Sequence, residues 1–289
     1  MTSTHGTPAR TLGTVVEVLE ETYPLSWAED WDRVGLVLGE RSAPVSTVLL
    51  AVDPTVAVAG EAIERGAELL ITHHPLLLRG ASFLPADDGK GAVVTSLLRA
   101  GTGLWCGHTN VDRSTRGTVG AWIDALDLQE PRPLVSGRRD TDQSGAHGSQ
   151  LFGLGAVGVL PAATTVGELT AAVADIVPET ARGILHTGEA DRAVRTIAVC
   201  PGAGDSFLDQ AAAAGVDVYL TSDLRHHPAL EHVEASADPA AVPALIDVPH
   251  AASEALWLPQ ARQLLQEALP GLEVLVSGHT TDPWSGRAG

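Results

Sequence analysis

The chain has 289 residues, of which 44% are hydrophobic and only 4% aromatic. This composition fits a globular protein and excludes a chain that is disordered throughout. With 36 acidic and 18 basic residues the net charge is -18, so we expect no extensive nucleic-acid-binding surface. A chain of this length can bury a substantial core and is expected to divide into two domains.

Neither a leader nor a membrane span is expected from the sequence. Residues 1–10 lack a charged start followed by an apolar stretch and read as a short flexible start, and no run of about 18 apolar residues follows. Cys106 and Cys200 lie in apolar, strand-like runs, which indicates buried thiols in a reducing compartment. We therefore expect a cytoplasmic protein with no membrane partner.

Strand-like apolar runs alternate with segments of helical period in the first part of the chain, which predicts an α/β fold. In open α/β sheets, ligands bind outside the carboxyl ends of the strands, so polar side chains that follow these strands are candidates for a site. The expected strands are 46–53, 67–72 and 104–106, and the expected helices are 54–65, about 91–100 and about 118–127.

Residues 131–150 interrupt this alternation. The segment is rich in Gly, Ser, Pro and charged residues and has no apolar period, so it is expected to be a linker or a long exposed loop. His147 lies within it and is expected to be solvated. The break indicates that a second domain follows.

The α/β alternation then resumes and continues to the end of the chain. A second α/β domain is therefore expected. From the break to the end of the chain, the pattern predicts strands at 152–160, 195–200, 216–221, 243–248 and 272–277, and helices near 165–177, 205–214 and 253–269.

Two adjacent histidines, His73 and His74, follow the expected strand 67–72 in the motif ITHHPLLL. Successive strand side chains point to opposite sides, and Pro75 imposes extended geometry on His74. The pair is therefore suited to two neighbouring metal ions rather than to chelating one. A buried, hydrogen-bonded pair of imidazoles is the alternative that the motif leaves open.

His108 and Asp112 lie in the motif GHTNVD, directly after the apolar strand 104–106. Asp112 is the better metal-ligand candidate, because a carboxylate can bridge two cations and offset their charge. His108 is expected to orient a ligand or to donate a hydrogen bond to substrate. The alternative is a turn in which Asn110 and Asp112 bond their own backbone.

His250 and Glu254 lie four residues apart in the motif HAASE. On a helix both side chains would share one face, one turn apart. Such a pair is common on solvated helices. The apolar strand 243–248 before it favours a site, because that strand would deliver both groups to the edge of the sheet.

Two further motifs lie in the same order as these three. They are AEDWDRVGLVLGE at 28–40 and CPGAGDSFLDQAAAAGVDVYLTSDLRHH at 200–227. Over nearly its whole length the chain resembles the Nif-three-like family, whose bacterial members are often labelled GTP cyclohydrolase 1 type 2 homologs. It departs from the family's usual sequence motifs at Arg33, Ser222 and Pro249, none of which is a candidate metal ligand.

The resemblance implies a Nif-three-like fold of two α/β domains with mixed sheets, with the metal site in the cleft at the strand carboxyl ends. Residues 1–130 and 240–289 would form a discontinuous metal-binding domain, and residues 131–239 an inserted second domain. The family also implies a homohexamer. Its dinuclear site would be formed by the residues His73, His74, Asp112, His250 and Glu254.

Mixed imidazole and carboxylate ligation suits two divalent ions of Zn, Mn, Fe, Co or Ni and selects poorly among them. Two such ions lower the pKa of a shared water and clamp an attacking and a leaving oxygen. The catalytic candidates are Glu254, which holds the metal pair, and His108 or His227 as a proton shuttle. We expect a hydrolase acting on a nucleotide, a related heterocycle or a phosphoester; the alternative is a non-catalytic metal-binding, metal-delivery or scaffold protein.

The segment 200–227 carries three less specific signals. Gly202 to Asp205 reads as a tight strand-to-helix turn or as a phosphate cradle, although no P-loop motif is present. Asp223 reads as a helix cap or as a catalytic group. His226 and His227 are expected near the cavity, outside the direct ligand set.

Overall fold

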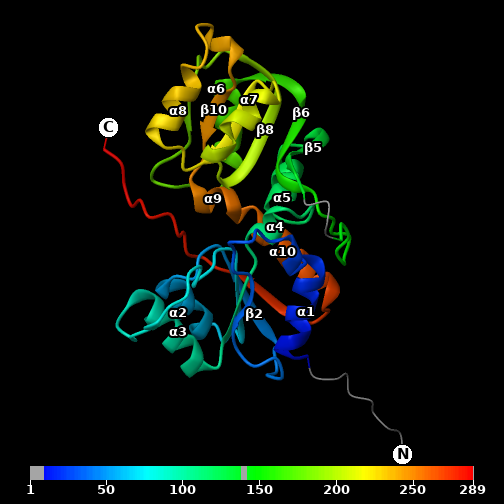
Figure 1. The fold of residues 1–289 in the computed structure, drawn as a ribbon. Helices are drawn as coiled ribbons and strands as arrows, with labels where there is room; N and C mark the ends of the chain where they lie inside the picture. Colours follow the sequence, from blue (N-terminus) through cyan, green and yellow to red (C-terminus); the bar gives the residue numbers. More distant parts are fainter. Residues whose placement is uncertain (1–9, 138–141, 289) are drawn as a thin grey trace, which may run out of the picture.

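The computed structural model describes residues 10–137 and 142–288. The chain folds into two α/β domains, each built around one mixed sheet. Figure 1 shows one domain above the other, with the chain crossing between them near α4, α9 and α10. The fold class expected from the sequence is confirmed. The expected flexible start falls on residues 1–9, which lie outside the described residues.

The first sheet, among the described residues, has five strands in the order β1-β4-β3-β2-β11. All neighbours pair in parallel except β1 and β4, which are antiparallel. Because β11 pairs with β2, a strand from the last part of the chain lies in the same sheet as strands from the first part. The strands are β1 (Gly35–Leu38), β2 (Thr47–Ala51), β3 (Leu69–Thr72), β4 (Gly103–Cys106) and β11 (Glu273–Val276).

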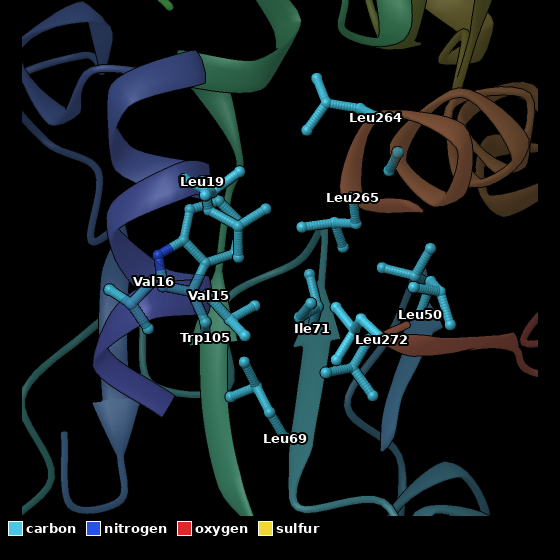
Figure 2. Packing of buried hydrophobic residues seen from close by; sticks show 14 of the residues in the cluster. Val15, Val16, Leu19, Leu50, Leu69, Ile71, Trp105, Leu264, Leu265 and Leu272 are labelled. Atoms are coloured by element: carbon cyan, nitrogen blue, oxygen red, sulfur yellow. The ribbon is translucent and has the colours of Figure 1, made fainter. Parts of the chain in front are cut away.

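Helices cover both faces of the first sheet, which explains why β2, β3 and β4 are buried at every position. On one face, Leu50, Ile71 and Trp105 pack with α1 (Leu12–Thr22) and α10 (Trp257–Ala268), as Figure 2 shows. Alternate residues of the same strands face the other way and pack with α2 (Val56–Glu64) and α3 (Gly89–Ala100). The core thereby fixes where the parallel strands end.

The second sheet has six strands within the described residues, in the order β5-β6-β8-β9-β10-β7. The central strands β8, β9 and β10 are parallel, and β5, β6 and β7 pair antiparallel. The strands are β5 (Gln129–Ser136), β6 (Gly153–Thr165), β7 (Leu185–His186), β8 (Ala193–Ala203), β9 (Val218–Ser222) and β10 (Ala244–Asp247).

Two pairs of helices cover the second sheet. One core cluster joins it to α5 (Thr118–Ala125) and α6 (Val166–Ile176), and another joins it to α7 (Leu208–Ala213) and α8 (His226–Val233). The remaining short elements are η1 (Leu25–Trp27), α4 (Thr109–Asp112), η2 (Asp205–Phe207), η3 (Pro239–Ala241) and α9 (His250–Ala255).

The expectation of a loop over 131–150 is wrong for its first part. Residues up to Ser136 belong to β5, which lies at the edge of the second sheet. Pro131 and Pro133 misled the prediction, because proline lacks an N–H for a central strand but is tolerated at an edge. His147 is exposed, as predicted.

The single helix expected over 253–269 is two helices, α9 and α10, which meet at Leu256. Pro259 accounts for the break, because it has no N–H to bond the carbonyl of Ala255 and its ring crowds that carbonyl. The first of these helices begins at His250 rather than at 253. Both candidate ligands of the HAASE motif therefore lie on the short helix α9.

Strand pairing bears on where the chain crosses between the domains. β10 falls within the range 240–289 that is expected for the first domain, but it pairs with β9 and β7 in the second sheet. The helix α5 packs on the second sheet as well. We therefore propose that the second domain runs from α5 to α9 rather than over 131–239. Over the described residues, no helix is long and apolar enough to cross a membrane.

Candidate metal centre

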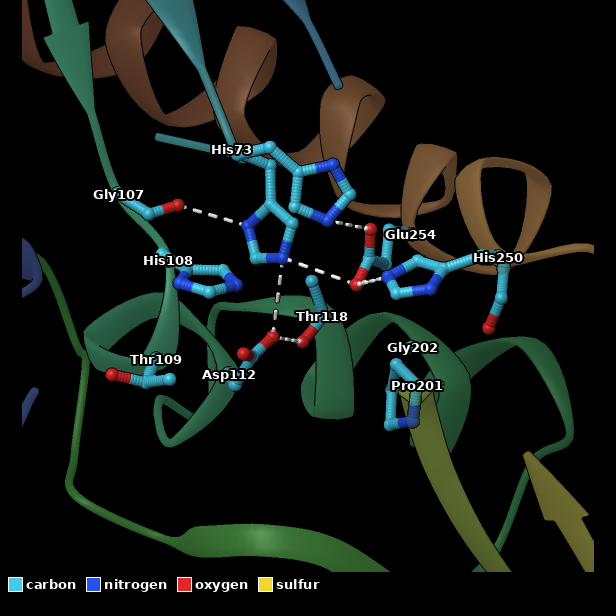
Figure 3. Close-up of polar contacts among 12 residues, drawn as sticks. His73, Gly107, His108, Thr109, Asp112, Thr118, Pro201, Gly202, His250 and Glu254 are labelled. Atoms are coloured by element: carbon cyan, nitrogen blue, oxygen red, sulfur yellow. Dashed lines mark hydrogen bonds and ion pairs between the residues drawn. The ribbon is translucent and has the colours of Figure 1, made fainter. Parts of the chain in front are cut away.

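Polar side chains from both domains meet in the space between the two sheets (Figure 3). They come from the loops that follow β3 and β4 and from the first turns of α9, which follows β10. The five expected ligands are brought together here, and a sixth side chain, the imidazole of His108, joins them. We call this group the metal cluster: His73, His74, His108, Asp112, His250 and Glu254.

Glu254 lies at the centre of the metal cluster and is 3% exposed. Its Oε1 lies 2.9 Å from His250 Nε2 and 3.3 Å from His73 Nε2. Its Oε2 lies 2.9 Å from His74 Nε2. One carboxylate from the second domain therefore faces two imidazoles of the first domain and one of its own helix.

Asp112 approaches the metal cluster beside His73. Its Oδ1 lies 3.5 Å from His73 Nε2 and accepts a hydrogen bond of 2.6 Å from the Thr118 hydroxyl. Asn110 takes the turn role that was the alternative for this motif, since its Oδ1 accepts from the backbone N–H of His108 at 3.0 Å. Asp112 is thus left facing the imidazoles.

The Nδ1 atoms of His73 and His74 are held by groups outside the cluster. His73 Nδ1 lies 2.8 Å from the carbonyl oxygen of Gly107, and His74 Nδ1 lies 2.7 Å from Asp53 Oδ1. With Nδ1 engaged in this way, each Nε2 is presented to the centre of the site. Asp53 was not predicted from the sequence, although a carboxylate just after strand β2 is a usable signal.

His250 and His108 are also backed by carboxylates. Asp223 Oδ2 lies 2.7 Å from His250 Nδ1, and Asp32 Oδ1 lies 2.9 Å from His108 Nδ1. Asp223 does not cap a helix as one reading predicted: α8 has Arg225 as its N-cap, without a side-chain cap. Asp32 was overlooked inside the motif 28–40.

The charges of the metal cluster act on one another strongly. Burial lowers the pKa of His73 and His74, but the neighbouring carboxylates together outweigh burial and raise the pKa of both: Glu254 with Asp112 for His73, and Glu254 with Asp53 for His74. The same balance raises the pKa of His250 to about 10. Burial alone would raise the pKa of Glu254, yet the three imidazoles hold that pKa well below its usual range. The carboxylates therefore favour positive charge on the imidazoles, and the imidazoles favour negative charge on Glu254.

The residues present fit a divalent metal. Among the described residues, His73 Nε2 and Glu254 Oε2 are buried and make ion-pair contacts, at 3.3 Å to Glu254 Oε1 and 2.9 Å to His74 Nε2, but no hydrogen bond of normal geometry, a cost that metal coordination would remove. The ligand atoms of His73, His74 and His108 lie within 4.8 Å of one another, as do those of His74, His250 and Glu254. This mixed nitrogen and oxygen set suits transition metals rather than Mg or Ca.

A cavity of about 400 Å³ opens beside the metal cluster, with Asp112, His250 and Glu254 in its wall. Trp31 contributes from the first domain and Phe207 from the second. Other lining residues include Leu78, His108, Leu154, Cys200 and Gly202. The Trp31 side chain is 55% exposed, and its ring meets the edge of the His108 ring at a centroid distance of 5.9 Å.

The segment after β8 is a strand-to-helix turn, as one reading predicted, and η2 follows it. The structure does not bring His227 to the cluster. His227 is exposed in the first turn of α8, where its ring packs against His226 at 5.1 Å. His108 lines the cavity, whereas His227 is not among the described residues that line it.

Comparison with known proteins gives the family. The family model of Duf34/NIF3 (NGG1p interacting factor 3) matches residues 10–283. A Streptomyces coelicolor protein named GTP cyclohydrolase 1 type 2 homolog is 42% identical, and the alignment covers 95% of this chain and 93% of that protein. A Mycobacterium tuberculosis protein of the same name is 32% identical, with 95% and 96% covered.

Solved structures agree on the fold. A Bacillus cereus protein described as related to NIF3 aligns with a TM-score of 0.83 at 21% identity, covering 96% of this chain and 99% of that chain. A Staphylococcus aureus hypothetical protein aligns with a TM-score of 0.82 at 26% identity, with the same coverage. On these matches over nearly its whole length, the chain belongs to the DUF34/NIF3 family.

Proposed function

We propose that the metal cluster binds two divalent ions and that the protein is a metal-dependent hydrolase acting on a nucleotide, a related heterocycle or a phosphoester. One observation carries this proposal: both oxygens of the buried Glu254 face imidazoles, and Asp112 approaches the same Nε2 atom of His73 that Glu254 faces. Two carboxylates placed in this way can be shared between neighbouring ions. The names of the relatives from Streptomyces coelicolor and Mycobacterium tuberculosis support a nucleotide as the substrate class.

Each residue has a distinct role in this proposal. The Nε2 atoms of His73, His74 and His250 hold the ions, and Asp112 and Glu254 offset their charge. When bound, two divalent ions polarise a substrate oxygen and lower the pKa of nearby water.

His108 is the group that moves a proton. Asp32 holds its Nδ1 at 2.9 Å, which leaves Nε2 for the cluster, and the imidazole lines the cavity. From there Nε2 can take up a proton and return it to a leaving atom. The exposed ring of Trp31 beside it offers a surface on which a flat heterocycle stacks.

Elemental analysis tests the metal proposal. We expect about two ions per chain in the purified protein, and their loss in an Asp112→Ala, Glu254→Ala double variant. The matched control is Glu64→Ala, which removes an exposed carboxylate of α2. Circular dichroism must show the same fold for all three. No bound metal, even after reconstitution with Zn, Mn and Fe, would overturn the proposal.

Turnover tests the hydrolase. A panel of nucleotides, heterocycles and phosphoesters is assayed with the metal-loaded protein, after chelation and after metal is added back. We expect activity that follows metal content, and a lower kcat per bound metal ion for His108→Ala. Activity that survived complete metal removal would contradict a metal-dependent mechanism. Two bound ions without turnover of the panel would instead favour the non-catalytic metal-binding, delivery or scaffold protein.

We also propose a cytoplasmic homohexamer, in line with the family resemblance. Cys106 and Cys200 are both free and buried, which supports a reducing compartment. Light scattering on the eluting protein tests the assembly, with an expected mass six times the chain mass of 29.9 kDa. A monomer or dimer at working concentration would contradict it.

A further inference from the structure

The segment that follows β11 stays in contact with the first domain. The backbone N–H of Ser277 donates to the carbonyl of Leu50 on β2 at 2.8 Å. The Ser277 hydroxyl and the N–H of Gly278 donate to the Glu61 carboxylate on α2, at 2.5 and 3.1 Å. Figure 1 shows this segment running from β11 upward past α9, the helix that carries two of the cluster residues.

At Thr281 the same segment reaches the carboxylate behind His74. The Thr281 hydroxyl donates to Asp53 Oδ2 at 2.5 Å, and the other oxygen of Asp53 lies 2.7 Å from His74 Nδ1. His74 Nε2 in turn lies 2.9 Å from Glu254 Oε2. A continuous series of contacts therefore leads from the C-terminal segment to the centre of the metal cluster.

Of the two adjacent histidines, His74 is the one whose position depends on the segment after β11. The imidazole of His73 is held by the backbone carbonyl of Gly107, which the end of β4 fixes in place. His74 is held instead by the side chain of Asp53, just after β2, and each oxygen of that carboxylate has one partner that fixes its orientation. His74 supplies one partner and Thr281 the other, from 228 residues away in the sequence.

We propose that Thr281 is a positioning residue for metal binding: it fixes Asp53, which fixes His74, so that the segment after β11 forms part of the metal site. This inference rests on the proposed metal binding. Hydrogen-bond partners behind metal-ligating histidines typically contribute about 10-fold to 100-fold in metal affinity, and Thr281 acts one step further out. The expected effect is therefore at the low end.

The test is a Zn²⁺ titration of the full-length, metal-free protein by competition with a chromophoric chelator. We expect Thr281→Val to weaken Zn²⁺ binding by about 10-fold, and Thr281→Ser, which keeps the hydroxyl, to bind as the wild type does. Thr280→Val makes the same substitution at the exposed neighbour and is expected to change nothing. Asp53→Asn should lose at least as much affinity as Thr281→Val.

A second readout separates positioning from general stability. The visible absorption of the Co²⁺-loaded protein reports ligand geometry, so Thr281→Val should shift its bands while Thr281→Ser and Thr280→Val leave them unchanged. Wild-type affinity and spectrum in Thr281→Val would overturn the inference, as would equal losses in Thr280→Val. A wild-type protein that binds no Zn²⁺ at all would instead refute the metal-binding proposal beneath it.

Discussion

Gly202 lies directly against Glu254. A β-carbon added at Gly202 would come within 2.4 Å of Glu254 Oε1 and 3.2 Å of His250 Nε2. Gly202 also has a φ of +70°, in the left-handed region that favours glycine. The backbone near the end of β8 therefore packs directly against the candidate metal centre. A larger residue at Gly202 would have to displace Glu254.

Gly202→Ala should therefore disturb the metal centre. The added methyl group would push Glu254 away, and we expect Zn²⁺ affinity to fall by about 10-fold or more. The left-handed backbone adds a cost of about 1–2 kcal/mol in the free energy of unfolding. Gly215→Ala is the matched control, because Gly215 has a φ of +67° and no atom within 4 Å of the added carbon. Equal Zn²⁺ affinity in the two variants would contradict the prediction.

Asp223→Asn should weaken metal binding while leaving the fold intact. The substitution removes the negative charge behind His250 Nδ1, and asparagine tolerates the φ of 56° found at this position. We expect Zn²⁺ affinity to fall by about 10-fold. Asp209→Asn, at an exposed position on α7, serves as control. Indistinguishable titration curves for the two variants would show that the charge of Asp223 plays no part.

Trp31→Ala should weaken the binding of ligands with a flat ring. If the ring stacks on the indole, affinity for a nucleotide should fall by about 10-fold, since aromatic stacking contributes about 1–3 kcal/mol. Inorganic phosphate has no ring and should bind equally well to both proteins. Trp284→Ala removes the other exposed tryptophan and is expected to have no effect. A nucleotide affinity unchanged by Trp31→Ala would place the ring elsewhere.

Asp217 should make the second domain's stability depend on acid pH. Its Oδ2 accepts the backbone N–H groups of Arg195 and Thr196, each at 2.8 Å, and the Thr196 hydroxyl at 2.9 Å. Burial alone would raise the pKa of Asp217, but these donors outweigh it and lower the pKa. The stabilisation is thus full above the unfolded-state pKa of about 3.9 and is lost as pH falls through the folded-state value.

Urea unfolding of metal-free wild type and Asp217→Asn across pH tests this. The difference in unfolding free energy should be constant near neutral pH and shrink below about pH 4. Asp191→Asn, at an exposed position, should show no such trend. A difference that persisted unchanged into acid would mean that the carboxylate's charge does not matter.

Much of the fold could be predicted because local pattern decides it. Apolar runs such as those of β2, β3 and β9 are buried at every position and could be recognised without the structure. The predictions that were wrong involve proline, which occurs in loops but also at the edge of a sheet and near the start of a helix. Proline at 131 and 133 suggested a loop but lies on an edge strand, and Pro259 divides a helix whose apolar period runs on without interruption.

The direct ligand candidates were also accessible from sequence, because each follows an apolar strand and carries a metal-ligating side chain. Their partners were not. Asp53 and Asp223 contact histidines 21 and 27 residues away, and Thr281 contacts Asp53 across 228 residues. A position after a strand makes these carboxylates candidates for the site, but nothing local indicates which histidine each of them contacts.

The sequence by itself determined the alternation of strands and helices and the choice of candidate metal-ligating side chains, because both depend on short stretches of chain. Only the tertiary structure decided that β10 joins the second sheet, that His108 reaches the cluster and His227 does not, and that Gly202 closes the wall beside Glu254. These outcomes depend on how two separately packed sheets bring their strand ends together, a relation between distant segments that no local pattern encodes.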